Sequence, residues 1–454
     1  MRAMALYQSG DAHAVTLVLQ SSSSWSKQGA DDAYRSLCDL QQFKALLGEL
    51  AYLGEGDGSW HTIYIGTGDE DDVQAIASVV NRLPAGAYAF QQTLSLRAMV
   101  IWSLAQYRFD EYNTTPEMGL RVLVTHSSYL NDAVAQASAV FLARDLINRP
   151  ANACGPQQLT QELANLAQHF NAEYKEWVGD ELIEHHFPAV HAVGRAASQA
   201  PRLAQLTWGQ QDHPRVTLVG KGVCFDSGGL DIKPASAMRL MKKDMGGAAI
   251  AIGLAQWLMA KKVPIRLHVL IPAVENAVAS EAYRPGDVLT MRNGMTVEIE
   301  HTDAEGRLIL ADALVKAFED NPDLVIDFAT LTGAARVAVG TELSAFFTAD
   351  DALAERVMQA GASCGDGMWR LPLFAGYDSL LRSQVADLSN ATSSPYAGAI
   401  TAALFLSYFV KKDRPWIHID TMAWNVSTKP GRPEGGEAMS MSAMFHLIMH
   451  TFNS

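Results

Sequence analysis

The chain has 454 residues, of which 48% are hydrophobic and 19% are charged, and its formal net charge is −14. This balance excludes disordered and fibrous classes, predicts two or more domains, and counts against a dominant nucleic-acid-binding role, which usually needs a basic surface. The four cysteines are scattered without a Cys-x-x-Cys pair, which excludes a disulfide scaffold and suits a reducing cytoplasm.

The N-terminal segment lacks the continuous apolar core of a signal peptide, and no apolar run is long enough to span a bilayer. We therefore expect a cytoplasmic protein without membrane contact. In the first third of the chain, short strand patterns and helical patterns alternate. The strands are predicted at 15–19, 62–65 and 121–124, and the helices at 71–81 and 87–104.

Two features of this region bear on its organisation. The acidic run at 69–72 stands where the helix at 71–81 begins, and the helix dipole favours acidic side chains there, so we interpret the run as structural rather than as a metal site. A long helical pattern at 130–148 stops at Pro150. Because proline ends helices, we place the main domain boundary here.

Beyond this boundary, strand and helix patterns alternate regularly. Strands are predicted at 216–219, 265–274, 295–300, 324–329 and 416–420, and helices at 246–260, 307–319 and 402–410. Strands separated by helices indicate a largely parallel sheet that is covered on both faces. In such sheets, ligands and catalytic groups gather at the carboxyl ends of the strands.

Charged residues follow two of these strands. The first strand is followed by Lys221, Asp226 and Lys233, and the run at 295–300 is followed by Asp303 and Glu305. A further carboxylate, Asp244, precedes the helix at 246–260. Carboxylates cannot cluster in a partly buried site without positive charge between them, and an oxygen-rich ligand set suits manganese, magnesium or zinc. The pattern favours a two-metal hydrolase.

Simpler interpretations of the same residues remain open on spacing alone. Thr302 and Glu305 fit the S/T-x-x-E capping box of a helix start. Asp226 fits a turn aspartate before Ser-Gly-Gly, and Lys233 fits a loop lysine before proline. A Gly361-x-Ser363-x-Gly match to the nucleophile elbow follows a helical run instead of a strand, so we interpret Gly361 as a helix C-cap.

Several longer segments together resemble one known family. VGKGVCFDSGGLDIKPA, MKKDMGGAA and TDAEGRLILADAL are similar to the signature segments of the leucyl aminopeptidase (cytosol aminopeptidase) family, and DFATLTGAARVAVGT, WRLPL, AGAITAALFL and WIHID continue the match in order. Upstream, ARDLINRPAN resembles the segment that opens the family's catalytic domain. The resemblance implies a smaller variable N-terminal α/β domain (1–130), a linking helix (131–160) and a catalytic metallopeptidase domain (161–454) whose mostly parallel sheet is sandwiched by helices.

Carried over position by position, the resemblance implies five metal ligands: Lys221, Asp226, Asp244, Asp303 and Glu305. Asp226 and Glu305 would bridge two divalent ions, Mn²⁺ or Zn²⁺, with Mg²⁺ as a further candidate. Lys221 and Asp244 would complete the tighter site, and Asp303 the more exchangeable one. An amine ligand must be neutral, so the ions have to lower the pKa of Lys221 far below its free value of about 10.4.

The resemblance also implies two catalytic residues that bind no metal, Lys233 and Arg307. The Lys233 ammonium would meet the developing oxyanion. Arg307 would hold a bicarbonate that acts as general base, beside a helix start whose N–H groups favour anions. The implied substrate-binding positions are Met241, Thr330, Leu331 and Gly333.

The implied activity is hydrolysis of N-terminal residues, leucine and other apolar ones, from peptides by a homohexamer. Two alternatives remain: a narrow dipeptidase, for example for Cys-Gly, and a family member with an added DNA-binding regulatory role, which the acidic balance disfavours. The chain departs from the family where His301 replaces the usual asparagine and where Met422 and Trp424 follow the last strand. His301 is either a supporting residue or a change in metal preference, and the other changes put the leucine preference in doubt.

Overall fold

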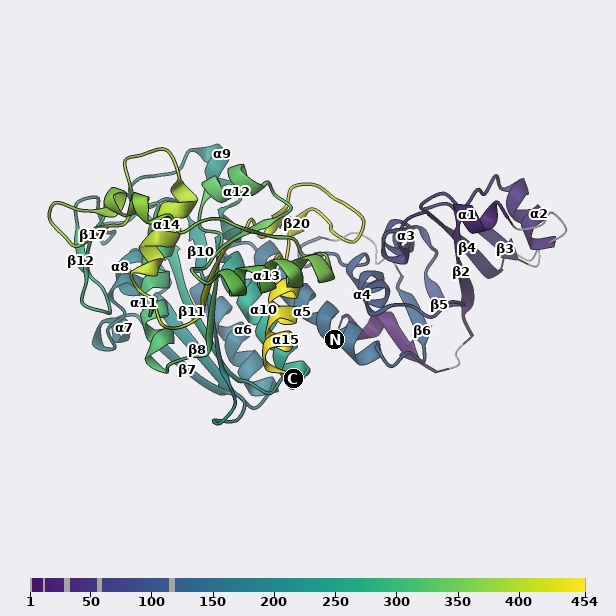
Figure 1. Ribbon diagram of the computed structural model, residues 1–454, viewed down its shortest axis with the longest axis horizontal. Coiled ribbons are helices and arrows are strands. Elements are labelled where there is room, and N and C mark those ends of the chain that lie inside the picture. The colour runs from purple at the N-terminus through teal and green to yellow at the C-terminus, as the bar shows by residue number, and fades with distance from the viewer. Residues whose placement is uncertain (1, 11–12, 28–32, 55–58, 114–118, 454) are drawn as a thin grey trace. The chain divides into compact units, whose positions relative to one another are not determined.

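The computed structural model describes residues 2–10, 13–27, 33–54, 59–113 and 119–453, and it divides into two compact units (Figure 1). The N-terminal unit comprises Met1–Phe141 together with Ser427–Glu434, and the C-terminal unit comprises Leu142–Val426 together with Gly435–Ser454. Helix α5 (Leu130–Asn148) carries the chain from the first unit into the second. Each unit combines helices with a mostly parallel sheet, which confirms the predicted two-domain α/β fold.

Within its described residues, the N-terminal unit has a six-stranded sheet in the order β1-β6-β5-β2-β4-β3, parallel except between β3 and β4. The strands are β1 (Tyr7–Ser9), β2 (Val15–Ser21), β3 (Leu50–Gly54), β4 (Trp60–Gly68), β5 (Gly86–Phe90) and β6 (Arg121–Thr125). The helices are η1 (Met4–Leu6), α1 (Ser22–Trp25), α2 (Ala33–Leu40), α3 (Asp72–Val79), η2 (Val80–Arg82) and α4 (Leu96–Leu104).

The sequence predictions for this unit are confirmed except at one place. The three predicted strands are β2, β4 and β6, and Asp71 of the acidic run caps α3 by accepting a hydrogen bond from the Gln74 N–H at 3.0 Å. The predicted helix at 87–104 is wrong in its first part, which forms β5 between β2 and β6. The helix α4 starts only after Ser95, whose side chain accepts from the Ala98 N–H.

Within its described residues, the C-terminal unit has a nine-stranded sheet in the order β16-β15-β18-β14-β9-β11-β8-β7, with β10 paired to β11. The central strands β18, β14, β9 and β11 are parallel neighbours, and antiparallel pairs lie toward both edges. The strands are β7 (Glu173–Val178), β8 (Arg202–Trp208), β9 (Arg215–Gly220), β10 (Gly222–Asp226), β11 (Arg266–Asn276), β14 (Leu324–Ala329), β15 (Ser344–Phe347), β16 (Met368–Arg370) and β18 (Trp416–Asp420).

Helices cover this sheet on both faces, and Figure 1 shows α11 and α14 on one side of the strands and α10 and α6 on the other. Every residue of β14 and β18 is buried, as expected for strands between two helical layers. The helices are α6 (Pro156–His169), α7 (Glu181–Glu184), α8 (Pro188–Gly194), α9 (Ala235–Met238), η3 (Met241–Met245), α10 (Gly246–Ala260), α11 (Glu305–Glu319), α12 (Gly333–Val339), α13 (Asp351–Cys364), η4 (Ala375–Leu381), α14 (Gly398–Ser407) and α15 (Met441–Phe452).

The start of α10 lies directly against the central strands. A Cβ at Gly247 would lie 2.0 Å from the carbonyl oxygen of Phe328 in β14, so only glycine allows this approach. Apart from Gln256, the helix is apolar on every face, and it is almost completely buried. The short turn η3, which precedes α10 and carries Asp244, packs against β10.

Three further predictions need correction. The strand predicted at 295–300 is shorter in the structure, where it is β13 (Thr296–Glu298). It does not belong to the main sheet, because its pairing partners are β12 (Val288–Thr290) and β17 (Leu388–Ser389), with which it forms a separate small sheet. The helix predicted at 402–410 is α14, which begins at Gly398. The C-cap of α13 is the left-handed Gly365 rather than Gly361, and Ser363 lies inside the last helical turn, which excludes the nucleophile elbow. A two-stranded ribbon of β19 (Trp424–Asn425) and β20 (Gly435–Gly436) completes the unit.

Candidate metal centre and active site

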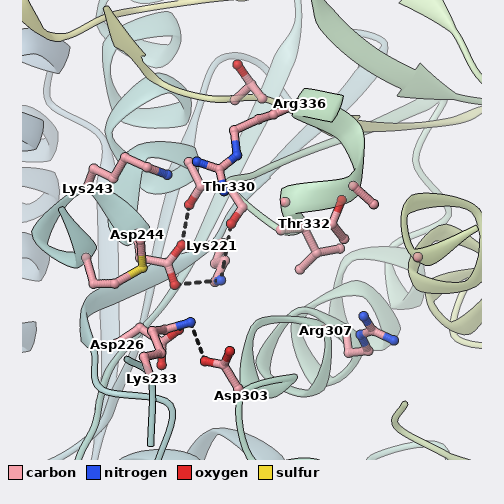
Figure 2. Close-up of a pocket in the computed structure, with 16 residues that line it drawn as sticks. Lys221, Asp226, Lys233, Lys243, Asp244, Asp303, Arg307, Thr330, Thr332 and Arg336 are labelled. Atoms are coloured by element: carbon pink, nitrogen blue, oxygen red, sulfur yellow. Dashed lines mark hydrogen bonds and ion pairs between the residues drawn. The ribbon is translucent and has the colours of Figure 1, made fainter. Parts of the chain in front are cut away.

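All eleven site residues predicted from the sequence lie together in the C-terminal unit, around one cavity of about 320 Å³ (Figure 2). Lys221 lies between β9 and β10, Asp226 ends β10, and Asp244 lies in η3. Asp303 and Glu305 lie at the start of α11, after the small sheet rather than after a strand of the main sheet. Ten of the residues line the cavity, and the eleventh, Glu305, pairs with the lining residue Lys221.

Three carboxylates form the buried core of the site. Ligand oxygens of Asp226, Asp244 and Glu305 all lie within 4.8 Å of one another, and each of these residues is at most 3% exposed. The Oε2 atom of Glu305 is buried and has no partner among the described residues. Because a buried carboxylate oxygen without a partner is costly, this cluster has the composition of a cation site.

Two lysines neutralise part of this charge. The Nζ of Lys221 lies 2.7 Å from Oδ2 of Asp244 and 2.9 Å from Oε1 of Glu305. The Nζ of Lys233 lies 2.8 Å from Oδ2 of Asp226 and also contacts Asp303. Four carboxylates thus lie close together around two ammonium groups.

The close approach of these charged groups shifts the pKa values of their side chains. Burial, together with the charge of Asp226, raises the pKa of Glu305 to about 8 and that of Asp303 to about 7. Burial acts to lower the pKa of Lys221, but Asp244 and Glu305 outweigh it, so that the pKa lies above its ordinary value. Oxygen ligands with one amine suit Mn²⁺ or Zn²⁺, and the residues present fit such ions, provided that Lys221 gives up its proton.

The interpretation of Thr302 and Glu305 as the capping box of a helix start is wrong. The N-cap of α11 is Ala304, without a side-chain cap, and the Glu305 oxygens make no capping hydrogen bond. The Thr302 hydroxyl instead donates to the Gly228 carbonyl at 2.6 Å and accepts from the Asp231 N–H at 2.9 Å. Thr302 therefore joins the loop after β10 to the start of α11.

Asp226 combines the turn role with a place in the carboxylate cluster. Its Oδ1 accepts from the Gly228 N–H and from Nδ2 of Asn276, both at 2.9 Å. Its Oδ2 faces Lys233. The side chain is thus held by one oxygen and presents the other to the centre of the site. Asn276 was not anticipated from the sequence, because an asparagine at a strand end carries no distinctive pattern.

Arg307 has no carboxylate within ion-pair distance among the described residues. Its Nη1 donates to the Asn390 carbonyl at 2.7 Å, and its Nε is buried without a partner. Burial lowers the pKa of Arg307 to about 10, and the more distant Glu305 and Asp420 oppose this effect. The guanidinium therefore faces the cavity with unused donors, as an anion-binding group would (Figure 2).

His301 lies outside the carboxylate cluster. Its Nδ1 accepts from the Asp303 N–H at 3.1 Å and lies 3.6 Å from Asp231, and its side chain is 51% exposed. Its carbonyl accepts from Nδ2 of Asn390. These contacts brace the turn that carries Asp303.

The expected substrate-binding residues line the cavity wall. Thr330 donates its hydroxyl to Oδ1 of Asp244 at 2.7 Å. The N–H groups of Leu331 and Thr332 both donate to Oδ1 of Asp420, which fixes the loop after β14. Met241 and Gly333 also face the cavity. Six lining residues were not predicted, and two of them are cationic: Lys243, next to Asp244, and Arg336, one helical turn after Gly333.

Comparison with known proteins agrees with this geometry. Residues 141–445 match the family model described as "Cytosol aminopeptidase family, catalytic domain", and residues 16–124 match "M17 aminopeptidase, N-terminal domain". The chain belongs to the cytosol aminopeptidase family and is therefore a peptidase. It is 39% identical over 363 residues to a probable cytosol aminopeptidase of Syntrophotalea carbinolica, covering 76% of this chain and 73% of that protein. With a Legionella pneumophila relative of the same description it shares 42% over 329 residues, covering 72% and 67%.

Solved structures show the same likeness over nearly the whole chain. The cytosol aminopeptidase from Coxiella burnetii matches with a TM-score of 0.93 and 42% identity, over 98% of this chain and 99% of that one. The bottromycin maturation enzyme BotP in complex with Mn matches with a TM-score of 0.87 and 33% identity, over 97% and 100%. Among the described residues, no helix has the length and apolar character that a membrane crossing requires.

Proposed function

We propose that this protein is a two-metal aminopeptidase that removes single residues from the N-terminus of peptides. The observation that supports this most directly is the buried cluster of Asp226, Asp244 and Glu305, in which Oε2 of Glu305 has no partner among the described residues. Lys221 and Asp303 would complete the ligand set. When bound, a pair of divalent ions would supply Lewis acidity for the scissile carbonyl and a nucleophilic water at neutral pH.

The residues around the ligands have distinct tasks in this proposal. Lys233 lies beside Asp226 and Asp303, where its ammonium could stabilise negative charge that develops on the carbonyl oxygen. Arg307 would hold a bicarbonate that takes a proton from the attacking water, since its Nε is unused. Met241, Thr330, Leu331 and Gly333 would receive the first residue of the substrate, close to the ligands.

The proposals for the metal ions, the location and the oligomeric state are based on the family to which the chain belongs. We propose Mn²⁺ or Zn²⁺ as the bound ions, a cytoplasmic location and a homohexamer. The complex of BotP with Mn supports manganese, because BotP is a relative with the same fold. The acidic chain gives no support to a DNA-binding role.

The test is hydrolysis by the purified full chain after chelation and reloading. Aminoacyl anilides and dipeptides should be cleaved with Mn²⁺ or Zn²⁺, and the same peptides with an acetylated N-terminus should resist, because a free α-amino group is required. Chelated enzyme should be inactive until metal returns. Cleavage of acetylated peptides at equal rates, or full activity in the chelated enzyme, would contradict the proposal.

A further inference from the structure

Two cationic side chains lie at the end of the cavity away from Lys233 and Asp303. Lys243 of η3 and Arg336 of α12 both line the cavity, and Figure 2 shows them pointing toward each other above Asp244 and Thr330. Lys243 is only 4% exposed, yet its Nζ makes no hydrogen bond or ion pair among the described residues. An amine that is buried in this way and directed into a cavity indicates a place for a ligand.

Nearby carboxylates are already engaged elsewhere. Oδ2 of Asp244 pairs with Lys221, and its Oδ1 accepts from Thr330. Asp420 accepts from the N–H groups of Leu331 and Thr332. Among the described residues, Arg336 has no ion pair, and its Nη1 contacts only the thioether of Met422, at 3.5 Å. The two cations therefore lack an anionic partner within the part of the chain that the structure describes.

The position of Arg336 relates this end of the cavity to the substrate's first side chain. A Cβ placed on Gly333 would lie 3.3 Å from Nη2 of Arg336, so the guanidinium lies directly over the expected substrate-binding glycine. Lys243 follows Met241, another expected substrate-binding residue, in the same turn. Thr330 separates this end from the metal ligands.

We propose that Lys243 and Arg336 form a cationic subsite that selects peptides beginning with glutamate or aspartate. This inference rests on the proposed aminopeptidase function, because the metal centre must hold the α-amino group for the side chain to reach the subsite. Arginine stays charged at any physiological pH and presents a planar donor fork that matches a carboxylate. The thioether of Met422 contacts one end of this fork and leaves the other donors for the substrate.

The test compares charged substrates with their neutral isosteres. The Mn²⁺-loaded wild type should cleave Glu- and Asp-anilides with a kcat/KM about 10- to 100-fold higher than Gln- and Asn-anilides, the usual advantage of a charge-assisted hydrogen bond over a neutral one. Arg336→Met and Lys243→Met should each reduce the Glu-to-Gln ratio toward one. Arg336→Lys should retain part of it, and Arg336→Glu should reverse it.

An exposed arginine elsewhere provides the matched control. Arg356 lies on the surface of α13 and does not line the cavity, so Arg356→Met should keep the wild-type ratio. A wild type that cleaves Gln- and Leu-anilides as well as Glu-anilide, or an Arg336→Met variant with an unchanged ratio, would overturn the subsite while leaving the aminopeptidase proposal in place. No cleavage of any anilide would contradict the aminopeptidase function itself.

Discussion

The amine of Lys221 occupies the space that a side chain at Gly306 would fill. A Cβ on Gly306 would lie 2.4 Å from Cε and 2.6 Å from Nζ of Lys221. Gly306 is the second residue of α11, directly after Glu305, so the helix can approach β9 and β10 closely only at a residue without a Cβ. The position of the amine among the carboxylates thus depends on a residue that has no functional group.

We expect Gly306→Ala to weaken metal binding, because the added methyl group forces Lys221 away from Asp244 and Glu305. Bound metal after dialysis, measured by elemental analysis, should fall below that of the wild type. Gly86→Ala is the control, since a Cβ there meets only the Tyr88 ring at 3.9 Å or more. Equal metal content in both variants and the wild type would show that Lys221 is not needed at its present position.

Removal of either carboxylate that is proposed to bridge the two ions should nearly abolish turnover. Glu305→Gln and Asp226→Asn keep the size of the side chain but remove a negative charge from the centre of the cluster. Loss of a group that only supports a ligand costs 10- to 100-fold, so loss of a ligand should reduce kcat by about 100-fold or more. The measurement is anilide hydrolysis with saturating Mn²⁺. Activity within a few-fold of the wild type for either variant would refute the two-metal centre.

Substitution of Lys221 and substitution of Lys233 should impair the enzyme in different ways, although both side chains pair with carboxylates in the structure. Lys221→Ala should reduce bound metal because it removes a ligand. Lys233→Ala should keep both ions and lower kcat by about 10²- to 10³-fold, the usual effect of removing one oxyanion donor. Elemental analysis of both variants beside kinetics distinguishes the roles, and equal metal loss would contradict them.

Arg307→Ala should lower kcat by roughly 10²- to 10⁴-fold with little change in KM, since the bicarbonate would act on water and not on substrate. In carbonate-free buffer, wild-type activity should rise when bicarbonate is added. The variant should respond weakly, because the unpaired guanidinium donors are gone. If both proteins respond equally, or neither does, Arg307 serves only to hold the Asn390 carbonyl.

The buried Asp312 should make stability depend on pH. It accepts hydrogen bonds from the N–H groups of Ala189, Val190 and Arg292, yet burial raises its pKa to about 7. Between about pH 4 and 7 the folded state therefore retains a proton that the unfolded state releases, so the free energy of unfolding falls as pH rises through this window.

Asp312→Asn should flatten this dependence. The thermal midpoint of the metal-free protein, followed from about pH 4.5 to 8, should fall less steeply with pH in the variant than in the wild type. Asp212→Asn, at an exposed turn, is the control and should follow the wild type. A variant with the wild-type slope would show that Asp312 is already ionised in the folded state at about pH 5.

Continuous apolar strands and glycine-rich charged segments were the most predictable parts of the fold. The strands β14 and β18 match the predicted ranges residue for residue. Every residue of both strands is buried, so the sequence of each strand is a nearly continuous apolar run with clear ends. The region at 87–104 was not predictable in the same way. Its apolar residues suit either a helix or a buried strand, and pairing with β2 and β6 decides the outcome.

Some residues of the candidate site could likewise be predicted from the sequence, and others could not. The carboxylates and lysines could be predicted because short motifs carry them together, as in TDAEGR. Lys243 and Arg336 lie within the quoted segments MKKDMGGAA and DFATLTGAARVAVGT, but their role could not be predicted, because the sequence does not show that η3 and α12 bring both residues to the same cavity. His301 departs from the family pattern in the sequence, but its contact with the Asp303 N–H could not be predicted, because that contact forms only in the folded turn.

The N-terminal unit is discontinuous along the chain, since Ser427–Glu434 belongs to it although the segments on both sides belong to the C-terminal unit. Within that unit, a Cβ on Gly431 would lie 2.3 Å from the side chain of Ile101, so the segment is closely packed there. No single cut in the polypeptide can therefore release either unit intact. Truncation near residue 141 would leave the 427–434 loop without its packing partners, and a chimera between relatives would have to exchange both pieces together.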